Sequence, residues 1–141
     1  MRCKGRRSAV IDARDCPDII PVLCAVAALC PGTTQIVNAG RLRLKECDRL
    51  HATACELNAL GADIVEHDDA LTIQGVARLN GGAQVWSHRD HRIAMMLAIA
   101  ATACEKPVLL TDVECVNKSY PRFFADFAQL GGKVHGRYVG Q

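Results

Sequence analysis

The chain has 141 residues, half of them hydrophobic, which is enough for one compact domain with its own core. Its 17 basic and 15 acidic residues give a formal charge of only +2, so a basic site must come from local clustering. Aromatic residues make up 4% of the chain, too few for a surface that stacks the bases of single strands. The composition therefore argues against a general nucleic-acid binder.

The eight cysteines form no CxxC pair. Four of them lie in runs rich in Ala and Leu that we expect to be helical, where a thiol behaves as a small buried hydrophobe: Cys24, Cys30, Cys55 and Cys104. We interpret them as reduced thiols and expect a cytoplasmic protein without a disulfide framework or a zinc site. The longest apolar runs, 19–30 and 93–104, are about a dozen residues each, too short to span a bilayer. No targeting segment is evident, and we expect no membrane association.

The first half alternates strands and helices. Asp18, between Pro17 and Pro21, is predicted to lie near a helix N-terminus, where a carboxylate is stabilised. Gly61 is predicted to end the second helix. The full prediction is a strand at 8–11, a helix reaching 30, a strand at 33–37, a helix at 50–60, a hairpin from 64–65 and 71–73, a turn at 80–82 and a strand at 84–86.

The stretch 41–49, RLRLKECDR, is the least expected way to begin a helix. It holds four cations and two carboxylates: Arg41, Arg43, Lys45, Arg49, Glu46 and Asp48. Helix N-termini are partially positive, so cations there make sense if an anion joins them. Lys45 and Arg49 are spaced to share one helical face, and we expect them to hold this anion together with backbone amides. A solvated charged turn is the alternative.

The second half repeats the pattern of the first. The last helix is predicted to begin at Pro121. Four landmarks recur at nearly the same offset: Asp18 and Asp90, Ile36 and Val108, Lys45 and Lys118, and the segments 60–64 and 130–134. We therefore predict an α/β fold built from two tandem βαβαββ units of roughly 70 residues, at about 1–75 and about 76–141.

A duplicated unit places equivalent helix starts on one rim. Cations recur at these starts as Lys45 with Arg49, then Arg92, then Lys118. Carboxylates lie among them: Asp18, Glu46 and Asp90. The cations suit a small ligand rich in phosphate or carboxylate, and a carboxylate held in a water-poor cleft can act as a general base.

Four segments, DARDCPDIIP, KECDRL, DHRIAM and NKSYPRFF, resemble signatures of the 3-phosphoshikimate 1-carboxyvinyltransferase (5-enolpyruvylshikimate-3-phosphate synthase) family. The resemblance implies the enolpyruvyl transferase fold, a two-domain inverted α/β barrel enzyme roughly three times as long, of which this chain would be the C-terminal part. It implies transfer of the enolpyruvyl group of phosphoenolpyruvate to the 5-hydroxyl of shikimate 3-phosphate, in aromatic amino acid biosynthesis, without a metal or organic cofactor.

The resemblance also assigns roles by position. Asp18 matches a substrate contact and proton acceptor, Glu46 a second acid–base carboxylate, and Lys45 a contact near the reacting centre. Other substrate-binding positions are Arg41, Arg49, Asp90, His91, Arg92 and Lys118, of which Arg49, Arg92 and Lys118 match the phosphoenolpyruvate cations. Cys47 stands where the family usually has Ser or Thr, a change from which we expect little effect.

The missing N-terminal part would supply the other half of the site, so we expect the chain to fold but not to turn over alone. Alternatives are a fragment of the UDP-sugar enolpyruvyl transferase, a non-catalytic module that binds anions or nucleic acid, or a structural fragment without binding. Carboxylates among the cations disfavour a nucleic-acid ligand, because they repel phosphates. His88, Asp90 and His91 lack a further ligand for a metal site.

Overall fold

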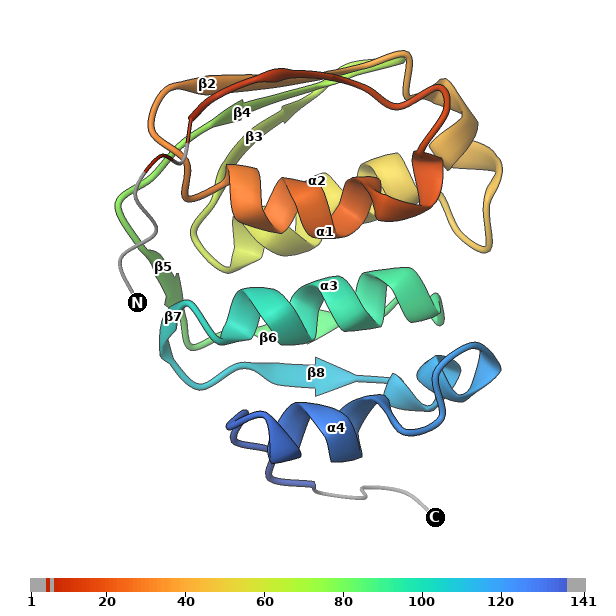
Figure 1. Cartoon of the computed structure of the whole chain (residues 1–141), viewed down its shortest axis with the longest axis vertical. Helices are drawn as coiled ribbons and strands as arrows, with labels where there is room; N and C mark the ends of the chain where they lie inside the picture. The colour runs from red at the N-terminus through yellow and green to blue at the C-terminus, as the bar shows by residue number, and fades with distance from the viewer. Residues whose placement is uncertain (1–4, 6, 137–141) are drawn as a thin grey trace.

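The computed structural model describes residue 5 and residues 7–136 (Figure 1). The first half contains β1 (Val10–Asp12), α1 (Ile20–Ala27), β2 (Thr33–Val37), α2 (Arg49–Ala59), β3 (Asp63–Glu66) and β4 (Leu71–Gln74). The second half contains β5 (Leu79–Gly81), β6 (Gln84–Trp86), α3 (His91–Ala101), β7 (Cys104–Lys106), β8 (Leu109–Thr111) and α4 (Phe123–Gln129). The α/β class predicted from the sequence is confirmed.

The first half folds as a four-stranded sheet in the order β1-β2-β4-β3. Strands β1 and β2 are parallel, joined through α1, whereas β4 runs antiparallel to both β2 and β3. In Figure 1 this sheet lies above α1 and α2, with α3, β8 and α4 following below. The succession β, α, β, α, β, β is the one predicted for a first unit.

The second half is built on a parallel ribbon. Strand β5 pairs with β7 and β6 with β8, and Gln84 pairs with Leu109 at the same sequence separation as Val10 with Gln35. The two pairs are continuous, because Gly82 N–H donates to Pro107 C=O (3.0 Å) between them. This equal register in both halves is what an internal repeat requires.

Several predicted boundaries differ in the structure. Residue 81 lies in β5 and not in a turn, since a Cβ there would stand 2.4 Å from the carbonyl oxygen of Lys106 and only Gly fits the pairing. Helix α1 ends at Ala27 instead of residue 30, because its last turn tightens into i→i+3 bonds such as Cys30 N–H to Ala27 C=O (3.0 Å). Cys104 lies in β7 and not in the preceding helix.

The second unit is shorter than predicted within the described residues. Helix α4 begins at Phe123, two residues after the predicted start, and no strand follows it up to residue 136. Val134, expected to correspond to Ile64 of β3, is in irregular structure. Residues 137–141 lie outside the described part, and the division of the chain near residue 75 stays a prediction.

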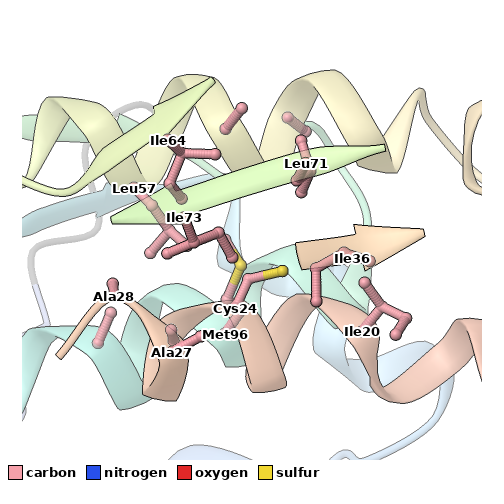
Figure 2. Close-up of a cluster of buried hydrophobic side chains, with 14 of the residues drawn as sticks. Ile20, Cys24, Ala27, Ala28, Ile36, Leu57, Ile64, Leu71, Ile73 and Met96 are labelled. Atoms are coloured by element: carbon pink, nitrogen blue, oxygen red, sulfur yellow. The ribbon is translucent and has the colours of Figure 1, made fainter. Parts of the chain in front are cut away.

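The main core lies between the sheet and the helices (Figure 2). It joins α1, α2, the sheet and α3 through fully buried side chains, among them Ile20, Cys24, Ile36, Leu57, Leu71, Ile73 and Met96. Burial raises the pKa of the Cys24 thiol to about 12, so this cysteine packs as a neutral hydrophobe. Cys55 does not follow the prediction, because it is exposed on α2.

All cysteines in the described part of the chain are free thiols. None of its helices has the length and apolar character needed to cross a membrane.

Candidate active site

The predicted site residues come together where the helices begin. Asp18 lies in the 3₁₀ turn that leads into α1, and Arg49 is the first residue of α2, three positions after Glu46. Asp90 is the N-cap of α3, and Lys118 ends the 3₁₀ turn that precedes α4. The starts of α1, α2 and α3 thus lie close together with Lys118 beside them, as the sequence predicted for these positions.

Arg49 is the centre of the cluster, with a side chain only 2% exposed. Its Nε donates to Asp90 Oδ2 (2.7 Å) and its Nη1 to Asp18 Oδ1 (3.1 Å). Its Nη2 donates to Glu46 and to Asp90 Oδ1 (3.2 Å). A guanidinium is the side chain best suited to this place, because its fork of five N–H donors can serve several carboxylates at once.

Asp90 is fully buried, with four donors around its carboxylate. Besides the two bonds from Arg49, it accepts from the backbone N–H of Arg92 (2.8 Å), which caps α3, and from Cys47 Sγ (3.4 Å). Burial alone would raise the pKa of Asp90, but hydrogen bonding and charge from Arg49 outweigh it and hold the pKa below its ordinary value. The site therefore contains a buried, ionised aspartate.

The cluster opens to solvent on the side of two lysines. Lys45 Nζ lies 3.8 Å from Asp18 Oδ1, and Lys118 Nζ lies 3.6 Å from Glu46 Oε1. The side chains of Asp18 and Lys118 are more than half exposed. A hydrogen bond from its own backbone N–H, with the charges of Arg49 and Lys118, holds the pKa of Glu46 below its usual range against the opposing effects of burial and Asp90.

The prediction that Lys45 and Arg49 share a helical face is wrong. Lys45 is in an extended conformation, and α2 begins only after Asp48, whose side chain accepts from the backbone N–H of His51 (3.0 Å). Asp is a strong N-cap, so it starts the helix beyond Lys45. Asp48 and Asp90 thus each occupy one of the free backbone N–H groups at the start of their own helices.

His91 and Arg92 form the start of α3 beside Asp90. His91 Nδ1 and Arg92 Nε are buried and have no hydrogen-bond partner within the described residues. Burial lowers the pKa of His91, despite opposing effects from Asp90 and Glu46, so its imidazole is neutral at pH 7. Unpaired buried polar atoms are costly, so these two atoms beside the cluster stand out among the described residues.

Arg41 lies apart from the cluster and stays a predicted substrate contact, whereas Cys47 touches the cluster. Arg41 is exposed on the turn Gly40–Leu44 and forms no ion pair with any residue that the structure describes, so nothing joins it to the cluster. Cys47, predicted to matter little, donates to Asp90, and burial with the nearby negative charge raises its pKa to about 12. Its place between Glu46 and Asp48 was the only sequence signal for this contact.

Across residues 7–136, no three His, Cys, Asp or Glu side chains converge as they would to hold a metal ion. His88 bonds instead to Glu56 of α2 (2.9 Å).

A buried arginine shared by three carboxylates, with lysines at its open side, gathers cations and carboxylates of this α/β chain in one site. The chain belongs to the EPSP synthase (3-phosphoshikimate 1-carboxyvinyltransferase) family, whose sequence profile matches residues 2–127. This confirms the resemblance seen in the sequence.

Individual relatives agree with that assignment. The chain is 62% identical to the 3-phosphoshikimate 1-carboxyvinyltransferase of Clostridioides difficile (strain 630) over 97% of its own length and 31% of the relative. It is 60% identical to the enzyme of the same name from Clostridium botulinum (strain Eklund 17B / Type B), over 95% and 31%. It thus spans about a third of the length of these curated relatives.

Solved structures show the same fold. EPSP synthase from Acinetobacter baumannii superposes with a TM-score of 0.75 at 32% identity, covering 80% of this chain and 27% of that one. The enolpyruvyl transferase NikO from Streptomyces tendae superposes equally well, with a TM-score of 0.75 at 25% identity, covering 90% and 28%.

Proposed function

We propose that this chain is the C-terminal part of a cytoplasmic 3-phosphoshikimate 1-carboxyvinyltransferase and supplies half of its active site. The substrates would be phosphoenolpyruvate and shikimate 3-phosphate, and no cofactor would be needed. The observation that carries the proposal is the convergence of Asp18, Glu46 and Asp90 on the buried Arg49, with Lys45 and Lys118 at the open side.

The reaction needs both kinds of group. The 5-hydroxyl loses its proton as its oxygen adds to the enol carbon of phosphoenolpyruvate, and the methylene carbon gains a proton. In the elimination that follows, the new methyl group loses a proton, the double bond re-forms and phosphate leaves. Two anionic substrates repel each other, so fixed cations are needed to bring them together and to stabilise the departing phosphate. We assign this task to Arg49, Arg92 and Lys118, with Lys45 nearer the reacting centre.

The carboxylates would move the protons. Asp18 is half exposed beside Lys45, where it can accept the proton of the hydroxyl. Glu46 lies between Arg49 and Lys118, next to the proposed phosphoenolpyruvate cations, and would be the second acid–base group.

Four of the five N–H donors of Arg49 already bond carboxylates, so an anionic substrate would gain more than one bond to Arg49 by exchanging partners. Asp90 is buried and caps α3, whereas Asp18 and Glu46 are partly exposed, so these two are the ones that a ligand anion would replace. The exchange would release a carboxylate from its ion pair at the moment when the substrate arrives. Substrate binding would thereby free a carboxylate to act as the base.

Turnover would require the rest of the enzyme. The chain spans 31% of the Clostridioides difficile relative, and the side chains of Asp18 and Lys118 are more than half exposed, so further residues could meet them there. We therefore propose that the remaining part of the enzyme completes the site, and that the chain alone forms no product.

The test is an NMR titration of the chain with phosphoenolpyruvate and, separately, with shikimate 3-phosphate. Saturable shifts are expected at the amides of Lys45, Arg49, Arg92 and Lys118, far larger than those caused by equal inorganic phosphate. Arg92→Gln should weaken phosphoenolpyruvate binding about tenfold or more, since a charged hydrogen bond is lost. Equal shifts with inorganic phosphate, or no effect of Arg92→Gln, would count against the proposal.

The exposed Arg78, which pairs with Glu105 away from the site, offers a matched control. Arg78→Gln removes the same charge and should leave the titration unchanged. A UDP-sugar added in place of shikimate 3-phosphate tests the related transferase, and tight binding of the UDP-sugar would favour that alternative.

A further inference from the structure

Helix α2 carries a second buried ionic side chain besides Arg49. Glu56 follows Arg49 by one heptad, about two turns, so both lie on the same face of α2. Glu56 is only 8% exposed. Its Oε2 accepts from the backbone N–H of Trp86 (3.0 Å), and its Oε1 lies 2.9 Å from His88 Nε2. Neither contact belongs to the substrate site described above.

The segment that Glu56 holds, 86–90, has an unusual backbone. His88 and Arg89 have positive φ angles of 54° and 56°, although neither is glycine. Such residues cost free energy and persist only where their surroundings hold them. Here the Trp86 ring stacks on His88 with centroids 4.3 Å apart, and Asp90 N–H donates to Ser87 C=O (3.0 Å). The strained pair therefore leads directly into Asp90.

The far side of the segment is tied to the strand end after β8. Trp86 Nε1 donates to Asp112 Oδ2 (2.8 Å), and Ser87 Oγ donates to the carbonyl of Asp112 (2.7 Å). Arg89 Nε lies 3.8 Å from the same carboxylate. Segment 86–90 is thus held between Asp112 on one side and α2 on the other.

We propose that Glu56 is a positioning residue that fixes segment 86–90 so that Asp90 meets Arg49. Helix α2 grips the segment at two points: Glu56 holds Trp86 and His88, and Arg49 holds Asp90. Without Glu56, the strained residues relax and Asp90 shifts from both the guanidinium of Arg49 and the start of α3. The effect of Glu56 on substrate binding rests on the proposed function, but its effect on the contact between Asp90 and Arg49 does not.

The test compares Glu56→Ala and Glu56→Gln in the absence of ligand. The first readout is the exchange of the Arg49 Nε proton with water, measured by NMR, because this proton points at Asp90. The second is the fluorescence of Trp86, the only tryptophan of the chain. Glu56→Ala should speed exchange about tenfold or more and change the emission, whereas Glu56→Gln, which keeps an acceptor for Trp86 N–H, restores most of both.

Glu66→Ala is the matched control, since Glu66 also joins a histidine, His51 (2.9 Å), and an arginine, Arg43 (2.9 Å), but does so away from Asp90. It should leave both signals within about twofold of the unmodified chain. Should Glu56→Ala fail to fold, His88→Ala removes one of the two contacts and should move the signals in the same direction. Unchanged exchange at Arg49 in folded Glu56→Ala or His88→Ala would overturn the inference.

Phosphoenolpyruvate is then titrated into the same variants. Weakening by about tenfold in Glu56→Ala, with recovery in Glu56→Gln, is expected because Asp90 orients Arg49. If the unmodified chain binds no phosphoenolpyruvate, the proposed function of the isolated site fails, while the ligand-free exchange still decides the role of Glu56.

Discussion

Asp90→Asn is the substitution that most cleanly probes the buried ion pair. Asparagine has nearly the same shape and is an equally good N-cap, so the bond from Arg92 N–H that caps α3 is retained. What changes is the charge, and the amide NH₂ takes the place of Oδ2, where it faces Arg49 Nε, which donates to that oxygen at 2.7 Å in the unmodified chain. The amide oxygen keeps the place of Oδ1 and the longer bond from Arg49 Nη2 (3.2 Å). Neither side chain is more than 2% exposed, so water cannot replace the lost partner.

Removing one member of a buried pair costs roughly 3–5 kcal/mol. Asp18 and Glu46 still neutralise Arg49, which puts the expected loss at the lower end, about 3 kcal/mol, or a fall in Tm of about 10 °C. Urea unfolding followed by circular dichroism measures it. The exposed Asp63→Asn of β3 is the control and should stay within about 0.5 kcal/mol of the unmodified chain.

A double-mutant cycle of Asp90→Asn with Arg49→Met measures the interaction free energy of this pair apart from the other contacts of each side chain. The double variant should be more stable than the sum of the single losses predicts, by about 2 kcal/mol, because each single variant leaves one group unpaired. Additivity within about 0.5 kcal/mol, or an Asp90→Asn variant as stable as Asp63→Asn, would refute the reasoning.

Three further outcomes are expected. Asp90 and Glu46 have pKa values below their ordinary 3.8 and 4.5, so the stability that they contribute is present above those values and is lost as pH falls through the folded-state pKa. The free energy of unfolding, measured against pH, should therefore fall below about pH 4, and it should fall less steeply in Asp90→Asn. Cys47, whose pKa is raised to about 12, should react with iodoacetamide at pH 8 more than about tenfold more slowly than the exposed Cys55, and a similar rate would contradict its bond to Asp90. Gly75→Ala should cost more than about 2 kcal/mol in urea unfolding, because a Cβ would lie 1.7 Å from the carbonyl oxygen of Cys30, and a neutral result would show that these backbones do not approach as described.

The convergence of the site was predictable because it follows from repetition. Once Asp18 and Asp90 are seen to precede equivalent helices, parallel pairing within each unit places them on one rim, and the structure has both at Arg49. The four segments that carry the family resemblance all contribute to this rim. The family signatures and the recurring landmarks of the sequence thus predicted the same residues independently.

The partners of Arg49 were not predictable from spacing. A cation near a helix start suggests an anion, but nothing local indicates that the anions are carboxylates of the same chain, two of which, Asp18 and Asp90, come from other segments. The prediction that Lys45 shares a helical face with Arg49 was wrong for a similar reason. Asp48 captures the helix start and leaves Lys45 extended, a competition between neighbouring residues that helical spacing alone does not resolve.

The second half shows the limit of pattern reading for glycine. Residues 80–82 have the composition of a turn, yet Gly81 pairs with Lys106 in a parallel ribbon, where the missing Cβ allows the close approach. The contact between Glu56 and His88 was also not predictable from the sequence. They lie far apart in the sequence, and only the packing of α2 against β6 joins them.

The central claim is that this chain is one working part of a 3-phosphoshikimate 1-carboxyvinyltransferase. The most direct measurement mixes it with the portion of the Clostridioides difficile relative that lies outside the matched 31%, and follows phosphate release from phosphoenolpyruvate that depends on shikimate 3-phosphate. The matching C-terminal piece of that relative is the positive control. We predict no release by the chain alone and release by the mixture. Phosphate release by the chain alone, or no release by the mixture while the control pair is active, would contradict the account.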